Sequence, residues 1–176
     1  MLKKLLLLIV FLLAGCIKVP EGVSVIDGFE LQRYLGTWYE IARIENSFEK
    51  NFTSVTATYT RNDDGSVDVL NRGFDAKKGE WKDTAGKAKF VGEENRGELK
   101  VSFFGPFFSS YNIVALDKEE YTWAIVCGYK KSLFWILSRN PVMEPALYDE
   151  LVRKADSLGF DTGDLVVNKV PDTEGL

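Results

Sequence analysis

Eight short apolar segments follow one another along most of this chain, and their regular spacing is the strongest constraint on its fold. Each is rich in β-branched and aromatic residues, as strands are, and short turns join them. The turn Asn62-Asp63-Asp64-Gly65 ends in the Asp-Gly pair that suits a tight hairpin. Such spacing indicates a β-sandwich or an up-and-down β-barrel rather than βαβ units. The predicted strands are residues 37–45, 53–61, 66–74, 81–91, 98–104, 111–117, 121–129 and 133–139.

Several of these strands are apolar on both faces, for example Val101-Ser102-Phe103-Phe104 and Trp123-Ala124-Ile125-Val126-Cys127. A sheet with one face in water would instead alternate apolar and polar residues. A barrel with an apolar lumen and a helix on its outer wall gives both faces apolar cover. We therefore predict an all-β fold, an eight-stranded antiparallel up-and-down β-barrel with one C-terminal α-helix packed on the outside.

The predicted helix spans residues 144–159. Pro145 suits the first turn of a helix, and Gly159 can end one. Between them apolar residues recur at helical spacing on one face. These are Leu147, Leu151, Ala155 and Leu158, and the segment Leu165 to Val170 then predicts one last short strand.

Composition excludes several classes of function. The chain has no histidine, which removes Ser-His-Asp and Cys-His catalytic sites and His-ligated zinc. Its 22 basic and 26 acidic residues give a net charge of −4, which argues against a nucleic acid partner. No metal or other cofactor is implied.

The first 15 residues have the features of a signal peptide. Lys3 and Lys4 precede an uncharged apolar stretch that is too short to span a bilayer. The segment Leu13-Ala14-Gly15-Cys16 resembles the lipobox of bacterial lipoproteins, in which cleavage precedes a cysteine that is then acylated. The resemblance implies that Cys16 anchors the mature chain in a membrane. Because residue 17 is Ile rather than Asp, it also implies the outer membrane, with the protein at its periplasmic face.

These features divide the chain into four parts: a signal peptide (1–15), an acylated N-terminus and tether (16–28), a barrel with its helix (29–170) and a tail (171–176). With Cys16 acylated, Cys127 has no cysteine left to pair with, so an intrachain disulfide is excluded.

Two distant motifs resemble the lipocalin family. Gly36-Thr37-Trp38 matches its G-x-W signature, and Leu31 to Leu35 fits the short helical turn that precedes it. Arg139, at the end of the eighth predicted strand, matches the arginine that lies across that tryptophan in lipocalins. The resemblance covers residues 29–170. Further segments, such as residues 38–43, 69–74 and 133–139, are similar to the bacterial outer-membrane branch of the family, whose nearest eukaryotic relatives are apolipoprotein D and the plant temperature-induced lipocalins.

The lipocalin resemblance implies roles for particular residues. Gly36, Trp38 and Arg139 would close the floor of the barrel, where an indole under a guanidinium gives a cation–π contact. If Trp38 points inward, strand alternation places further residues on the lumenal face, where each could contact a ligand or pack in the core. These predicted ligand contacts are Glu40, Ala42, Ile44, Val69, Asn71, Val101 and Phe103. For Glu40 a structural role close to the floor is favoured over a ligand contact.

A run of phenylalanines at one predicted hairpin has three interpretations. Phe104, Phe107 and Phe108 could line the mouth of the barrel, touch a membrane or form a subunit contact. The resemblance implies a homodimer, which fits the third interpretation.

Taken together, these features predict a binding protein rather than an enzyme. The resemblance implies that a fatty acid or lysophospholipid from the membrane is bound and carried in the bacterial envelope. One alternative is an envelope structural or stress protein with a filled barrel. A second is an enzyme that uses Cys127 as a lumenal nucleophile on a bound lipid, although a buried cysteine is usually only a small hydrophobe.

Overall fold

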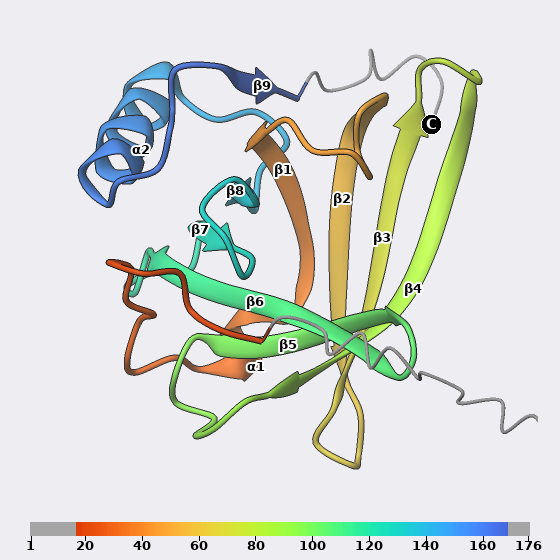
Figure 1. The fold of residues 1–176 in the computed structure, drawn as a ribbon, viewed down its shortest axis with the longest axis vertical. Helices are drawn as coiled ribbons and strands as arrows, with labels where there is room; N and C mark the ends of the chain where they lie inside the picture. The colour runs from red at the N-terminus through yellow and green to blue at the C-terminus, as the bar shows by residue number, and fades with distance from the viewer. Residues whose placement is uncertain (1–16, 169–176) are drawn as a thin grey trace, which may run out of the picture.

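The structure, a computed structural model, describes residues 17–168. Nine antiparallel strands form one sheet in the order β2-β3-β4-β5-β6-β7-β8-β1-β9, and pairing of β1 with β2 closes the first eight into a barrel. The fold class predicted from the sequence is confirmed. The strands are β1 (Gly36–Ile44), β2 (Phe52–Arg61), β3 (Val67–Asp75), β4 (Glu80–Phe90), β5 (Glu98–Phe104), β6 (Phe107–Leu116), β7 (Trp123–Cys127), β8 (Phe134–Ser138) and β9 (Leu165–Val167). Figure 1 shows β5 and β6 crossing in front of the strands β2, β3 and β4.

Two helices complete the fold. The single turn α1 (Leu31–Tyr34) precedes β1 at the closed end of the barrel, and α2 (Pro145–Ser157) lies outside the wall beside β7 and β8 (Figure 1). No helix among residues 17–168 is both long enough and apolar enough to cross a membrane.

The core has two compartments, one on each side of the barrel wall. The inner cluster contains Trp38, Val69 and Leu137, whereas the outer cluster joins Leu151 and Ala155 of α2 to the outer faces of β1, β6, β7 and β8. Along β7, Ala124 and Val126 belong to the inner cluster, and Ile125 and Cys127 to the outer one. This arrangement explains why these strands are apolar on both faces.

The segment before the barrel, for which a tether was predicted, makes hydrogen bonds to the barrel at Lys18 and Ile26. Lys18 donates its backbone N–H to Ser110 Oγ at 2.7 Å and accepts, at its carbonyl, hydrogen bonds from Ser110 and Asn112. Ile26 donates its backbone N–H to Ile113 O at 3.0 Å and accepts a hydrogen bond from Gly97 N at 2.9 Å. These contacts hold the segment against β6 at Lys18 and at Ile26.

Gly97 provides a test of this docking. A Cβ at this position would lie 2.8 Å from the backbone oxygen of Ile113 and 2.8 Å from the side chain of Ile26. We expect Gly97→Ala to lower the free energy of unfolding by about 1–3 kcal/mol, because the backbones must move apart. Urea unfolding measures the change. The matched control is Gly92→Ala, since a Cβ at that residue meets nothing within 4 Å; an equal loss in both variants would contradict the close packing at Gly97.

Candidate functional site

The interior of the barrel holds a cavity of about 810 Å³. This volume lies in the range of binding sites for small molecules, and most of the lining is apolar. Val67, Val69, Leu99, Val101 and Leu137 form its walls. Phenylalanines from three regions surround its mouth, and these are Phe48, Phe52, Phe103, Phe104, Phe107 and Phe108.

The floor is closed by Trp38 and Arg139. Trp38 is fully buried, donates Nε1–H to the carbonyl of Tyr34 at 2.8 Å, and has the guanidinium carbon of Arg139 4.0 Å from its ring centre. Arg139 also donates to the backbone carbonyls of Arg33, Leu35 and Thr37 at 2.7–2.9 Å. This one side chain therefore ties α1 to the start of β1 from below. Gly36, with φ of +90°, adopts a backbone conformation that favours glycine, and its Cβ position lies 3.5 Å from Arg139.

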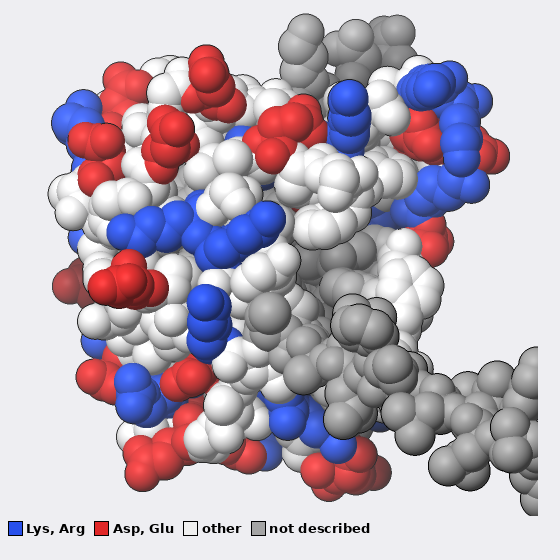
Figure 2. Space-filling view, viewed as in Figure 1, with Lys and Arg blue, Asp and Glu red and all other residues white. Residues whose placement is uncertain are grey.

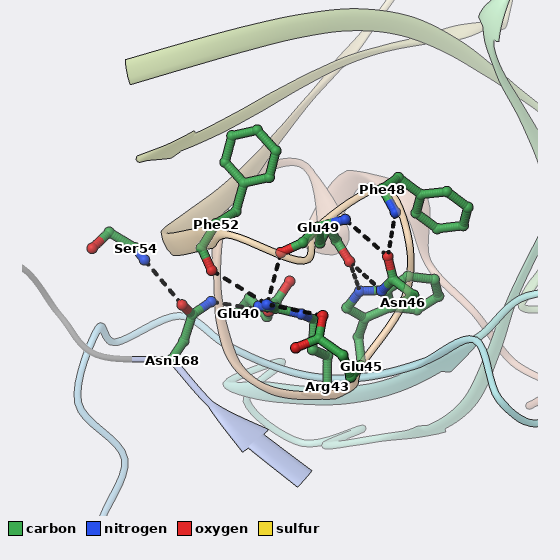
Figure 3. Close-up of polar contacts among 10 residues, drawn as sticks. Glu40, Arg43, Glu45, Asn46, Phe48, Glu49, Phe52, Ser54 and Asn168 are labelled. Atoms are coloured by element: carbon green, nitrogen blue, oxygen red, sulfur yellow. Dashed lines mark hydrogen bonds and ion pairs between the residues drawn. The ribbon is translucent and has the colours of Figure 1, made fainter. Parts of the chain in front are cut away.

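A buried polar cluster occupies the opposite end, where β1 enters its loop (Figure 3). Arg43 Nη1 donates to Glu40 Oε1 at 2.8 Å, and Arg43 Nη2 donates to the carbonyls of Glu49 and Phe52. The side chains of Arg43 and Glu40 are no more than 3% exposed. Asn168 also donates to Glu40 Oε1, at 2.9 Å, and accepts from the backbone N–H of Ser54. The cluster therefore joins β1, its loop, β2 and the chain after β9.

A second carboxylate, Glu49, links this polar cluster to the neighbouring strand β8. It accepts hydrogen bonds from Asn46 Nδ2 at 2.6 Å and from Trp135 Nε1 of β8 at 3.0 Å. Burial raises the pKa of Glu40 to about 8, and the nearby charge of Glu49 adds to the rise, while Arg43 opposes it. Among the described residues, no group of three or more Cys, Asp or Glu side chains is placed to hold a metal ion.

Comparison with known proteins decides the family. Residues 29–170 match the model of the lipocalin-like domain, which is most of the chain. The chain belongs to the lipocalin family. It is 47% identical over 161 residues to the outer membrane lipoprotein Blc of Vibrio cholerae, with 92% of this chain and 94% of that protein covered. It is 45% identical over 158 residues to the Blc of Escherichia coli K12, with 89% of each covered.

More distant lipocalins match over most of their length as well. Temperature-induced lipocalin-1 of Arabidopsis thaliana is 35% identical over 163 residues, which cover 88% of this chain and 85% of that one. Among solved structures, insecticyanin from the tobacco hornworm superposes with a TM-score of 0.69 at 20% identity, over 89% of this chain and 87% of that one. At that identity the likeness shows the fold alone.

The predicted ligand contacts of this lipocalin divide into two groups. Glu40, Val69, Asn71, Val101 and Phe103 line the cavity. Ala42 and Ile44 do not, because they face outward into the cluster around α2. The prediction that they contact the ligand is therefore corrected.

A β-bulge in β1 is the physical reason for this correction. Glu40 pairs with Leu137 of β8 and Ala42 with Ile136, so Ile41 is an extra residue opposite β8. An extra residue shifts every later side chain to the other face of the strand. As a result the lumenal face of β1 is taken by Trp38 and Glu40, while Ala42 and Ile44 pack outside.

Cys127 also faces away from the lumen. It is fully buried in the outer cluster, and burial raises the pKa of its thiol to about 12. A thiol with so high a pKa carries almost no thiolate at neutral pH, and the thiolate is the nucleophilic form. The alternative of a lumenal cysteine nucleophile therefore loses its geometric basis.

Sequence reasoning missed several residues of the site. Arg43, Glu49 and Asn168 of the polar cluster were not singled out, nor were the tyrosines that line the lower cavity. An arginine between two apolar residues in Ala42-Arg43-Ile44 is the one local signal that a buried charge was present. Asn168 gives no such signal, because its role depends on β9 pairing with β1.

Glu40 predicts a pH dependence of stability. Its pKa is about 8 in the folded lipocalin, against an ordinary value of 4.5, so the folded state holds a proton that the unfolded chain releases. The stabilisation from this proton is complete below pH 4.5 and is lost as the pH rises through 8, with a slope of at most about 1.4 kcal/mol per pH unit.

Urea unfolding between pH 5 and pH 8 measures this effect. We expect the Glu40→Gln variant, which has no titrating proton, to lose that part of the slope. Glu150→Gln, at an exposed position on α2, is the matched control and should keep it. Identical slopes in the wild type and Glu40→Gln would contradict the raised pKa.

Proposed function

We propose that this lipocalin is a lipid-anchored protein of the bacterial outer membrane that binds a fatty acid or a lysophospholipid in its lumen. The observation that carries the proposal is the apolar cavity of about 810 Å³ that opens at a mouth ringed by phenylalanines. An acyl chain gains about 0.8 kcal/mol for each methylene group that leaves water for such a site. We propose binding and carriage or storage rather than catalysis.

The proposed anchor is Cys16, which lies outside the described residues. Two observations support it: the Leu13-Ala14-Gly15-Cys16 lipobox, and relatives from Vibrio cholerae and Escherichia coli that are named outer membrane lipoproteins. The contacts of Lys18 bear on the position of this anchor, since Ser110, which hydrogen-bonds the backbone of Lys18, also lines the cavity. An anchor on residue 16 would therefore lie close in sequence to a fixed point on the wall of the binding site.

The mouth suits a ligand with a polar head. Phe104 and Phe107 are 79% and 51% exposed there, so they can meet an acyl chain or the surface of a bilayer. Lys82 lines the same opening, and Lys77 and Lys78 belong to the adjacent β3–β4 turn. Figure 2 shows basic side chains over this turn, at upper right, with acidic side chains beside them, and Lys78 and Lys82 are paired with Asp75 and Glu80. We propose that these lysines attract the anionic carboxylate or phosphate of the ligand.

Mass spectrometry under native conditions tests the proposal. The chain from residue 17 onward is used, because all the pairings that close the barrel lie within residues 17–168. After purification from bacteria, we expect a bound mass that solvent extraction identifies as a fatty acid or a lysophospholipid. A protein that is empty and also takes up neither added lipid would overturn the proposal and favour a structural envelope role. The same spectrum tests the proposed homodimer, for which Phe104, Phe107 and Phe108 are the candidate contacts.

A further inference from the structure

Three tyrosine hydroxyls meet inside the lumen, where an apolar acyl chain would make no hydrogen bonds. Tyr111 Oη lies 2.7 Å from Tyr34 Oη and 2.8 Å from Tyr59 Oη. All three side chains line the cavity, and they come from α1, β2 and β6. In the closed order of strands, three strands separate β2 from β6 by either route, so the hydroxyls of Tyr59 and Tyr111 meet across the lumen from opposite walls.

The three hydroxyls mark the lower boundary of the cavity. Below them the ring of Tyr34 packs on Trp38 with 4.6 Å between ring centres, and Trp38 in turn covers Arg139. On the β5 wall, Tyr111 pairs with Leu99, while Val101 and Phe103 follow toward the mouth. Four residues of strand, about 13 Å, separate the level of Tyr111 from that of Phe103. The inner part of an acyl chain whose head stays at the mouth would thus reach these hydroxyls.

The hydrogen bonds within the cluster leave one hydroxyl hydrogen without an acceptor. Three hydroxyls carry three hydrogens, and the two O···O contacts use two of them. Among residues 17–168 no acceptor is placed for the third hydrogen. Burial raises the pKa of Tyr34 and Tyr111 well above the ordinary value and that of Tyr59 to about 12, so all three keep their protons at neutral pH.

We infer that the tyrosine cluster is a second polar subsite, which binds a hydroxyl group carried on the inner part of a long acyl chain. The inference rests on the proposed lipid-binding function. A hydroxyl fits because it accepts the spare hydrogen and donates its own to a tyrosine oxygen. A carboxylate does not fit as well, because its charge would lose water, and the guanidinium of Arg139 below Trp38 already donates to backbone carbonyls.

The inference is tested by whether a hydroxylated fatty acid binds more tightly or more weakly than the plain fatty acid. In an apolar lumen a hydroxylated chain binds more weakly than the plain chain, because its hydroxyl loses hydrogen bonds to water. With the subsite, we expect 12-hydroxystearate or 18-hydroxystearate to bind about 3- to 10-fold more tightly than stearate. Displacement of a fluorescent fatty acid from the chain starting at residue 17 measures the three dissociation constants.

A triple variant places the effect at the cluster. Tyr34→Phe/Tyr59→Phe/Tyr111→Phe removes all three hydroxyls, and with them the spare hydrogen, but keeps the rings. We expect it to lose the preference for the hydroxylated acids while stearate affinity changes little. Tyr148→Phe on α2, outside the barrel, is the matched control and should keep the preference. Stearate bound as tightly as both hydroxylated acids, or an unchanged preference in the triple variant, would overturn the subsite and leave the carrier function intact. Failure of all three acids to bind would instead count against the proposed function itself.

Discussion

Replacement of Trp38 by alanine is expected to lower the free energy of unfolding of this lipocalin by about 3–5 kcal/mol. The indole is fully buried, and it is the layer between the ring of Tyr34 above and the guanidinium of Arg139 below. Its removal leaves a cavity at the floor and leaves the carbonyl of Tyr34 without its donor. Since the whole domain is marginally stable by only about 5–15 kcal/mol, the variant would be close to unfolding.

Two further variants separate the contributions at the floor. Trp38→Phe keeps an aromatic ring but loses the Nε1–H donor, so we expect a smaller loss of about 1–3 kcal/mol. Trp81→Ala removes an indole of the same size from the outer face of β4, where it is partly exposed and contacts Phe74 and Arg72. Urea unfolding of the three variants ranks their losses of unfolding free energy. A loss for Trp81→Ala as large as that for Trp38→Ala would contradict the role of the floor.

Filling the lumen is expected to weaken lipid binding about 50-fold. Ala57 lines the cavity from β2, and tryptophan at this position would project into the space of the ligand. If the new ring displaces three methylene groups of the acyl chain, the loss is about 2.4 kcal/mol. Stability should change little, because the ring enters a cavity instead of a packed core.

A matched alanine on the other face of the sheet provides the control. Ala85 on β4 is exposed and pairs with Leu70, so Ala85→Trp places the same ring outside the barrel. Displacement of a fluorescent fatty acid gives the two affinities. Equal affinities in Ala57→Trp and Ala85→Trp would mean that the ligand binds elsewhere than in the lumen.

Much of the fold was predictable because it depends on local patterns. The bounds of β5 were predicted to the residue, and most other strands to within one or two residues, since alternation and turn residues mark their ends. The start of β6 was missed by four residues. There the segment Phe107 to Ser110 follows Gly105-Pro106 directly and resembles a continuing turn rather than a strand.

The site was less predictable because it depends on contacts between distant segments. Strand alternation placed Glu40 correctly, but the bulge at Ile41 follows from the pairing of β1 with β8, about 95 residues further along the chain. The tyrosine hydroxyls meet only because the barrel closes and brings β2 opposite β6. A single sequence carries no local signal of either event.

The docking of residues 18–28 limits how far the barrel can move from the proposed lipid anchor on residue 16. A fully extended chain spans at most about 3.6 Å per residue, so a free segment of 12 residues would let the domain drift roughly 40 Å into the periplasm. With Lys18 fixed to Ser110, the slack is about 7 Å. The domain would then stay close to the surface of the bilayer. A lipid that leaves the membrane for the lumen would cross little water. Its transfer would not require diffusion through the periplasm.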